Sequence, residues 1–152
     1  MDPLSTNGDG RPGPPEDPAA TASVIDQHLR ALRSTYPRVG ATEAADLYRR
    51  GALLVDIRPD SQRLRFGDIP AAVVIDRNVL EWRLDPTSPD RDPQVTDDPE
   101  RVVVVICQEG YASSLAAASL RAVGLRGATD LDGGFVAWKA AGLPVRGGPP
   151  GP

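Results

Sequence analysis

The stretch that decides the fold runs from residue 101 to residue 120 and reads RVVVVICQEGYASSLAAASL. An apolar, β-branched run ends on Cys107, and a short loop that contains Gly110 follows it. The next segment is rich in alanine, which favours a helix, and Ser113 or Ser114 is expected to cap its first turn. The pattern therefore predicts a buried strand, a tight loop and a helix, with the cysteine at the carboxyl end of the strand.

Three further apolar runs have the length of buried strands, and they span residues 52–57, 72–75 and 128–131. Helical patterns are predicted over residues 23–36, 42–50, 78–84, 114–123 and 135–141, and an exposed loop over residues 85–99. Strands that are apolar on both faces suit a parallel sheet covered by helices. We therefore expect an α/β domain of three layers with a mostly parallel central sheet.

The ends of the chain differ in composition from its middle. The sequence has 16 prolines and 15 glycines in 152 residues, and many of them lie in the first 20 and the last six positions. Segments with so little to bury do not join a core. We expect residues 1–20 to be a disordered tail, residues 21–146 to form one domain and residues 147–152 to be a flexible tail.

Composition also excludes several classes of function. The net charge of −4 gives no general electrostatic attraction to nucleic acid or to an anionic membrane. The longest apolar run, residues 102–107, is too short to span a bilayer, and no signal peptide is visible. The single cysteine cannot form an internal disulfide, which suits the cytoplasm. No cluster of histidine or cysteine and no glycine-rich phosphate loop is present, so neither a metal nor an organic cofactor is expected.

Cys107 stands where a nucleophile would be activated. The loop that follows it can curl into a nest, an arc of backbone N–H groups that face one point and bind an anion. The N-terminus of the next helix adds the positive end of its dipole. Both features favour the thiolate, which is the nucleophilic form of cysteine. The alternative is a small buried hydrophobe, but the combination of strand, glycine loop and following serines favours a functional cysteine.

The sequence resembles the rhodanese family in four stretches that follow the family order. These stretches are VDIRP at 55–59, FGDIPAA at 66–72, CQEGYAS at 107–113, and LDGGFVAW at 131–138 with AGLP at 141–144. The resemblance implies a rhodanese fold over about residues 40–146 and a persulfide on Cys107. It also implies that the loop residues bind the substrate and that Asp56 and Arg58 support the loop from beneath. The loop residues are Gln108, Glu109, Gly110, Tyr111, Ala112 and Ser113.

The loop departs from the family pattern at one position that matters for binding. Ala112 stands where many relatives have Arg or Lys, so the loop lacks a cation of its own. By the same match, Arg77 should face the mouth of the site. Arg77 is therefore either a second source of positive charge or an ordinary surface arginine.

The reaction that the resemblance implies is transfer of a sulfane sulfur from a donor such as thiosulfate to cyanide or a thiol. A double displacement of this kind needs one cysteine and no cofactor. Phosphatase chemistry would need a guanidinium to clamp the phosphoryl oxygens, and Ala112 stands where that arginine would be. Two alternatives stay open: a non-catalytic or regulatory interaction module, and a sulfur carrier for a partner enzyme. A protein could thus be the sulfur acceptor.

Overall fold

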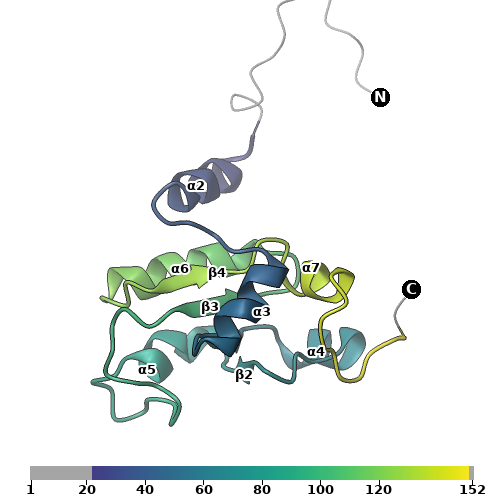
Figure 1. The fold of residues 1–152 in the computed structure, drawn as a ribbon. Helices are drawn as coiled ribbons and strands as arrows, with labels where there is room; N and C mark the ends of the chain where they lie inside the picture. The colour runs from purple at the N-terminus through teal and green to yellow at the C-terminus, as the bar shows by residue number, and fades with distance from the viewer. Residues whose placement is uncertain (1–21, 151–152) are drawn as a thin grey trace, which may run out of the picture.

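The structure is a computed structural model, and it describes residues 22–150 of the chain. The expected tail over residues 1–20 lies outside the described residues. The centre of the molecule is a sheet of four parallel strands in the order β2-β1-β3-β4 (Figure 1). The strands are β1 (Leu53–Asp56), β2 (Val73–Val74), β3 (Val103–Ile106) and β4 (Ala128–Asp130). The predicted α/β class with a parallel sheet is confirmed.

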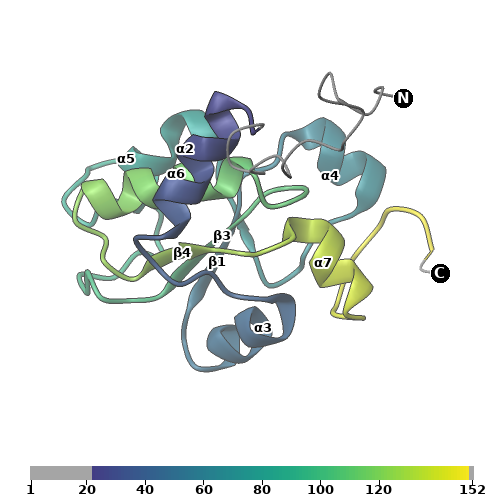
Figure 2. The same ribbon diagram turned by 90° about the horizontal axis from the view of Figure 1, so that it is seen from above.

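Helices cover both faces of the sheet. They are α2 (Val24–Arg33), α3 (Ala41–Arg49), α4 (Asp60–Phe66), the 3-10 turn η1 (Arg77–Val79), α5 (Leu80–Leu84), α6 (Ala112–Ala122) and α7 (Gly134–Ala140). Figure 2 shows α3 and α7 on one side of the strands and α5 and α6 on the other, with α2 lying across α6. The three predicted layers are therefore present, and α2 adds a further element outside them.

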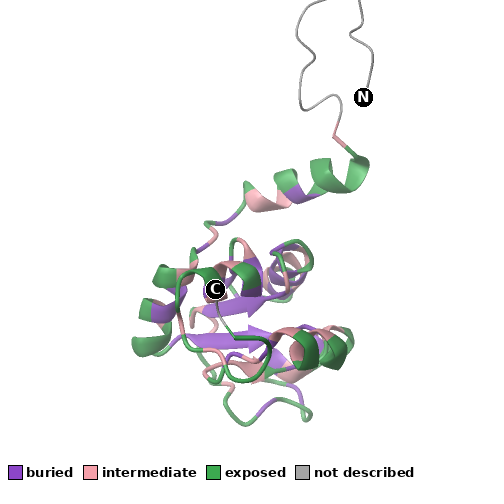
Figure 3. Cartoon of the chain, turned by 90° about the vertical axis from the view of Figure 1, so that its right-hand side faces the viewer, coloured by how far each residue is buried: buried purple, intermediate pink, exposed green. Residues whose placement is uncertain are grey.

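The strands alternate between two cores, which is why they are apolar on both faces. Side chains at Leu53, Val55 and Val103 pack with Leu80, Leu84, Ala116 and Leu120 from α5 and α6. The intervening side chains at Leu54, Val104 and Ile106 pack with Ala44, Ala45, Phe135 and Trp138 from α3 and α7. Figure 3 shows the strands buried and the outer faces of the helices exposed. Burial on both faces fixes the sheet in the middle of the domain.

Local sequence signals differ from the structure at two helix starts. The helix predicted over residues 42–50 begins one residue earlier, at Ala41, and its N-cap residue, Gly40, offers no side chain. The serine cap predicted for the helix after Cys107 is also absent, because α6 begins at Ala112 and its N-cap, Tyr111, makes no side-chain cap hydrogen bond. Helix α4 was missed because none of its residues is buried, which leaves no apolar period to detect.

The carboxyl ends of three strands meet at one edge of the sheet. Asp56 is paired in register with Ile106, and Asp130 with Val105. Cys107 follows Ile106 directly, so the cysteine and both aspartates lie at the edge where ligands bind in open α/β sheets. Across residues 22–150, no helix has both the length and the apolar character that crossing a membrane requires.

Candidate active site

The Cys107 sulfur lies inside an arc of backbone N–H groups. The N–H of Gly110 donates to Sγ at 3.2 Å, and the N–H of Ser113 donates to the same atom at 3.3 Å. Gly110 adopts a φ of +90°, which bends the loop back toward the sulfur and which other residues rarely adopt. Donors aimed at sulfur, together with the N-terminus of α6, stabilise negative charge on that atom.

Other backbone N–H groups of the loop have no acceptor among the described residues. Within the described part of the chain, four further N–H groups of the loop donate no hydrogen bond, those of Gln108, Glu109, Tyr111 and Ala112. The Cys107 side chain is 7% exposed and opens into a pocket of about 340 Å³. The pocket is lined by Gln62, Cys107, Gln108, Glu109, Tyr111 and Ala112. It therefore combines a reactive sulfur, unused backbone donors and room for a small ligand.

Arg58 connects the end of β1 to the cysteine loop. Its guanidinium forms a buried ion pair with Asp56 at 2.8 Å and donates to the Gly67 carbonyl at the same distance. It also donates to the side-chain oxygen of Gln108 at 3.0 Å. The guanidinium carbon lies 4.0 Å from the centre of the Phe135 ring. The structure thus brings Asp56 and Arg58 against the loop, as the resemblance implied, and their effect on function stays a prediction.

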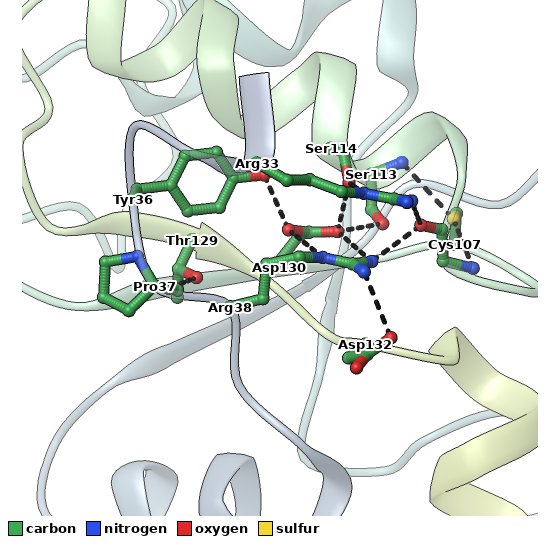
Figure 4. A network of polar contacts seen from close by, with 11 residues as sticks. Arg33, Tyr36, Pro37, Arg38, Cys107, Ser113, Ser114, Thr129, Asp130 and Asp132 are labelled. Atoms are coloured by element: carbon green, nitrogen blue, oxygen red, sulfur yellow. Dashed lines mark hydrogen bonds and ion pairs between the residues drawn. The ribbon is translucent and has the colours of Figure 1, made fainter. Parts of the chain in front are cut away.

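Asp130, at the end of β4, holds the start of α6 in place (Figure 4). Its carboxylate is fully buried and accepts hydrogen bonds from Ser113 Oγ at 2.8 Å and Ser114 Oγ at 2.9 Å. It also accepts from Tyr36 Oη at 2.7 Å and pairs with Arg38 at 3.0 Å. The two hydroxyls expected to cap α6 are used here instead, because a buried carboxylate needs several donors.

Burial and pairing shift the titration of this cluster. Burial by itself would raise the pKa of Asp130, but hydrogen bonds from Arg38, Tyr36 and Ser113 lower it below its usual value. Burial, followed by the hydrogen bond to Asp130, raises the pKa of Tyr36 to about 12. Burial would lower the pKa of Arg38, yet its bond to the Asp130 carboxylate raises it. Asp130 is thus charged, and Tyr36 neutral, around neutral pH.

Two arginines that precede the four family-like stretches in the chain contact the loop on the side of the Gly110 carbonyl. Arg33 Nη2 donates to the Gly110 carbonyl at 2.7 Å, and Arg38 Nη2 donates to the same oxygen at 2.8 Å. Arg33 Nε also donates to Ser114 Oγ at 2.9 Å. Figure 4 shows both guanidinium groups beside Ser114 and Asp130. None of these residues was predicted from the sequence: neither Arg33 and Arg38, nor Asp130, which pairs with Arg38, nor Tyr36, which donates to Asp130.

Helix α7 also binds the backbone of the cysteine loop. The N–H of Phe135 donates to the Cys107 carbonyl at 2.9 Å, and the N–H of Val136 donates to the Gln108 carbonyl at 3.1 Å. This approach is close, because a Cβ on Gly134 would lie 2.4 Å from the Cys107 carbonyl oxygen. Gly134 also has a φ of +59°. The glycine pair at 133–134 therefore forms the turn that brings α7 against the cysteine backbone.

The structure does not bring Arg77 into the pocket. Its guanidinium pairs with Glu81, one helical turn later, at 2.9 and 3.0 Å. Arg77 is not among the residues that line the cavity beside Cys107. Glu81 in turn accepts from Ser119 of α6, so the charge of Arg77 is tied to the α5–α6 contact. Of the predicted site residues, only Arg77 lies away from the others.

At the C-terminal end, packing contacts continue past residue 146, where the predicted domain ends. Asp68 and Arg146 exchange backbone hydrogen bonds of 2.8 Å. Lys139 Nζ donates to the Pro149 carbonyl at 3.2 Å, and Gly148 lies close to the backbone of Phe66. The segment through residue 150 thus lies against the α4 and α7 side of the molecule.

Comparison with known proteins gives this architecture a family. The rhodanese-like domain family matches residues 40–141. A thiosulfate sulfurtransferase GlpE from Pseudomonas savastanoi pv. phaseolicola is 31% identical over 105 residues, which cover 69% of this chain and 89% of that protein. A sulfurtransferase from Allochromatium vinosum is 33% identical over 93 residues, 61% of this chain and 77% of that protein.

Among solved structures, one from Rhodopseudomonas palustris, described as a protein of unknown function and possible tyrosine phosphatase, superposes with a TM-score of 0.71. It is 31% identical and covers 88% of this chain and 100% of its own. The relatives named as sulfurtransferases support the predicted enzyme class, whereas thiosulfate as the donor stays a prediction. The family match spans the sheet, the Asp56–Arg58 pair and the Cys107 loop, and the predicted resemblance is confirmed: the chain belongs to the rhodanese-like domain family.

Proposed function

We propose that the protein is a sulfurtransferase that carries a sulfane sulfur as a persulfide on Cys107. The observation that carries the proposal is the set of backbone donors around the sulfur. Two N–H groups point at Sγ, and four more in the same loop have no acceptor among residues 22–150. An outer sulfur and the oxyanion of a donor would use those free groups.

In the first step the Cys107 thiolate attacks the outer sulfur of thiosulfate. A new S–S bond forms on Cys107, the S–S bond of thiosulfate breaks, and sulfite leaves with that bond's electron pair. The leaving group is an anion in a pocket of about 340 Å³, which is ample for it. The loop N–H groups stabilise the negative charge that develops on both sulfur and oxygen.

In the second step a thiophile removes the outer sulfur. Cyanide attacks the terminal sulfur through carbon, thiocyanate forms, and the electron pair of the persulfide bond returns to Cys107 as thiolate. A thiol acceptor attacks in the same way and leaves as its own persulfide. No redox partner is needed, because each step exchanges one S–S or C–S bond for another and no net oxidation occurs.

Phosphoryl transfer suits this site less well. A loop that cleaves phosphate esters needs a guanidinium on the equatorial oxygens. The residues that line the Cys107 pocket include no arginine and no lysine, and Ala112 stands at the end of the loop. Sulfur transfer to a cysteine thiolate needs no such clamp, so the lining residues suit a sulfur donor better.

The acceptor and the compartment complete the proposal. A free thiol that must stay reduced between cycles fits a cytoplasmic protein. The pocket is open to solvent at Tyr111, which is 57% exposed, so a partner protein could present its thiol there. As a sulfur carrier, the protein would pass the same persulfide to a partner enzyme in place of a small molecule.

Mass spectrometry after incubation with thiosulfate tests the proposal directly. The intact protein should gain one sulfur, about 32 Da, and peptide mapping should place it on Cys107. Cys107→Ser should lose both this adduct and cyanide-dependent thiocyanate formation. Thiocyanate formation by the serine variant at the wild-type rate would refute the mechanism. A protein that takes up no sulfur from thiosulfate or from an organic persulfide would be the interaction module instead.

A further inference from the structure

Arg33 of α2 binds the backbone of the cysteine loop. Its guanidinium donates to the Gly110 carbonyl at 2.7 Å and to Ser114 Oγ at 2.9 Å. Its guanidinium carbon also lies 6.0 Å from the centre of the Tyr111 ring. Within residues 22–150, no carboxylate lies within ion-pair distance of Arg33. Arg38 contacts the same carbonyl, but Asp130 and Asp132 neutralise its charge.

The contact to Gly110 fixes the direction of a donor on the next residue. The Gly110 carbonyl and the Tyr111 N–H belong to one peptide group, and none of the described peptide bonds is cis. In a planar trans peptide the N–H points opposite to the C=O. Because the carbonyl is held by guanidinium groups behind the loop, the Tyr111 N–H is directed away from them. Tyr111 lines the Cys107 pocket, and its N–H donates no hydrogen bond within the described residues.

We propose that Arg33 is a positioning residue for donor binding, which acts through the Gly110 carbonyl to aim the Tyr111 N–H at the anionic substrate. This role rests on the proposed sulfur transfer at Cys107. The guanidinium also polarises the shared peptide group, which makes its N–H a stronger donor. Ala112 leaves the loop without a cation of its own, and Arg33, bound to the Gly110 carbonyl, supplies part of that missing positive charge.

The position of Arg33 in the chain makes α2 part of the site. The rhodanese-like family match begins at residue 40, so α2 lies entirely outside it. Helix α2 packs on α6, and Leu29 is its buried residue. Residues 40–152 make up about three quarters of the chain, whereas the Rhodopseudomonas palustris structure covers 88% of it. That likeness therefore extends into the segment before residue 40.

Alkylation of Cys107 by two reagents tests the role of Arg33 without any sulfur donor. Iodoacetate is an anion and iodoacetamide is neutral, so their rate ratio measures how well the loop attracts an anion. Arg33→Gln should lower the ratio about three-fold or more, since it removes one charge and the hold on Gly110. Arg30→Gln is the matched control, because it removes the same charge one helical turn earlier, where no loop hydrogen bond is made.

Arg33→Lys separates the charge from the hydrogen-bond geometry. Lysine keeps the charge but cannot bind Gly110 and Ser114 together in the same fork. The lysine variant should therefore recover only part of the anion preference. If Arg30→Gln lowers the iodoacetate preference as much as Arg33→Gln does, the effect is a general field and the positioning role is wrong. The lysine variant keeps this test valid even where Arg33→Gln folds poorly.

Kinetics with thiosulfate link Arg33 to the reaction. Arg33→Gln should raise KM for thiosulfate about five- to twenty-fold and change kcat less than three-fold, because the loss is in binding the anion. Arg30→Gln should leave KM unchanged within about two-fold. An equal fall in kcat and kcat/KM, with KM unchanged, would overturn the proposal. If no variant and no wild-type sample transfers sulfur, the proposed function fails, and the alkylation ratio still decides the role of Arg33.

The amide resonance of Tyr111 provides a direct reading of the N–H itself. Thiosulfate added to Cys107→Ser cannot react and only binds, so the shift of that resonance measures hydrogen bonding to the donor. In the Cys107→Ser background the Tyr111 resonance should move on titration, and with Arg33→Gln added it should move less than half as far at saturation. A shift at saturation that is the same with and without Arg33 would show that the guanidinium does not orient this peptide.

Discussion

Ser113 joins Asp130 to Cys107 through two atoms of one residue. Its hydroxyl donates to the Asp130 carboxylate at 2.8 Å, and its N–H donates to Cys107 Sγ at 3.3 Å. Because Asp130 ends β4 and Ser113 lies in the first turn of α6, this residue fixes the helix start against the sheet. The Ser113 N–H that faces the sulfur is therefore held in place by a buried carboxylate. Substitutions at Asp130 should thus alter the surroundings of the Cys107 sulfur.

Replacing Asp130 should destabilise the fold in a pH-dependent way. At pH 7, Asp130→Asn should lower the free energy of unfolding by about 3 kcal/mol, since it leaves Arg38 and several buried donors without their carboxylate. The folded-state pKa of Asp130 is lowered, so its contribution is fully present above the unfolded value of about 3.9 and is lost as pH falls through the folded value. Urea unfolding at several pH values should show the two proteins converging only below about pH 4.

Asp132→Asn provides the control for the Asp130 prediction. Asp132 also pairs with Arg38, but its side chain is 68% exposed. An exposed pair contributes little, so the loss should stay below about 1 kcal/mol. Equal losses in the two variants, or a difference between wild type and Asp130→Asn that does not depend on pH, would show that the Asp130 network is not the source of stability.

Truncating Arg58 should be costly because it leaves a charge buried. Arg58→Ala removes the partner of the Asp56 carboxylate, which is 1% exposed, and should cost about 3–5 kcal/mol in unfolding free energy. Removing the charge at both positions, as in Asp56→Asn with Arg58→Met, should recover part of that loss. Chemical denaturation measures both. A single variant that loses less than 1 kcal/mol would show that water relieves the unpaired carboxylate.

Gly134→Ala should disturb the loop and the fold together. The added methyl group would lie 2.4 Å from the Cys107 carbonyl oxygen and 2.8 Å from the Gly110 nitrogen, so the loop or α7 must move. We expect a loss of more than about 3 kcal/mol and slower alkylation of Cys107. Gly142→Ala is the control, because its φ is also positive but nothing lies within 4 Å of its Cβ. Its cost should stay near 1–2 kcal/mol, with unchanged alkylation. Similar losses in both variants would mean that φ alone, and not the close approach, matters.

A cation placed in the loop should strengthen thiosulfate binding. Ala112 is exposed and lines the pocket, so Ala112→Arg has room to bring a guanidinium to the donor. Charge-assisted hydrogen bonds contribute ~1.5–3 kcal/mol, and exposure reduces this, so KM should fall roughly three- to thirty-fold. Steady-state thiocyanate formation measures it. An unchanged KM would point to a donor other than thiosulfate.

Arg77→Ala is the companion measurement. Because Arg77 pairs with Glu81 away from the lining of the pocket, KM for thiosulfate should change less than about two-fold. A strong rise in KM in this variant would show that Arg77 leaves Glu81 to bind the donor.

Features encoded by neighbours in the chain could be predicted from the sequence. The run before Cys107 is apolar at every position because β3 is covered on both sides, and the loop curls because Gly110 can adopt a positive φ. The loop donors to Cys107 come from three and six residues further on. Such short-range geometry follows from local residue types. The pair of Arg58 and Asp56, two residues apart, was expected from the family resemblance.

Other features depend on competition that no local pattern reveals. Ser113 and Ser114 are residues of a type that caps helices, but the acceptor they use is the Asp130 carboxylate, which lies 17 and 16 positions later, respectively. Arg77 matched a site position by sequence, yet Glu81 provides a partner one turn away. In each case a polar group takes the partner that burial makes most favourable, and that partner is known only after the chain is folded.

The sequence alone thus determined the α/β class, the parallel sheet, the nucleophile and the loop that surrounds it, because the apolar runs that predict buried strands and the glycine that bends the loop are local features of the chain. The tertiary structure alone decided what holds that loop. Arg33 and Arg38 lie 77 and 72 positions before Gly110, and only the packing of α2 on α6 and the return of β4 to the sheet bring them together with Asp130. The local sequence does not distinguish these two arginines from solvent-exposed ones, because the carbonyl that they bind belongs to a residue far along the chain.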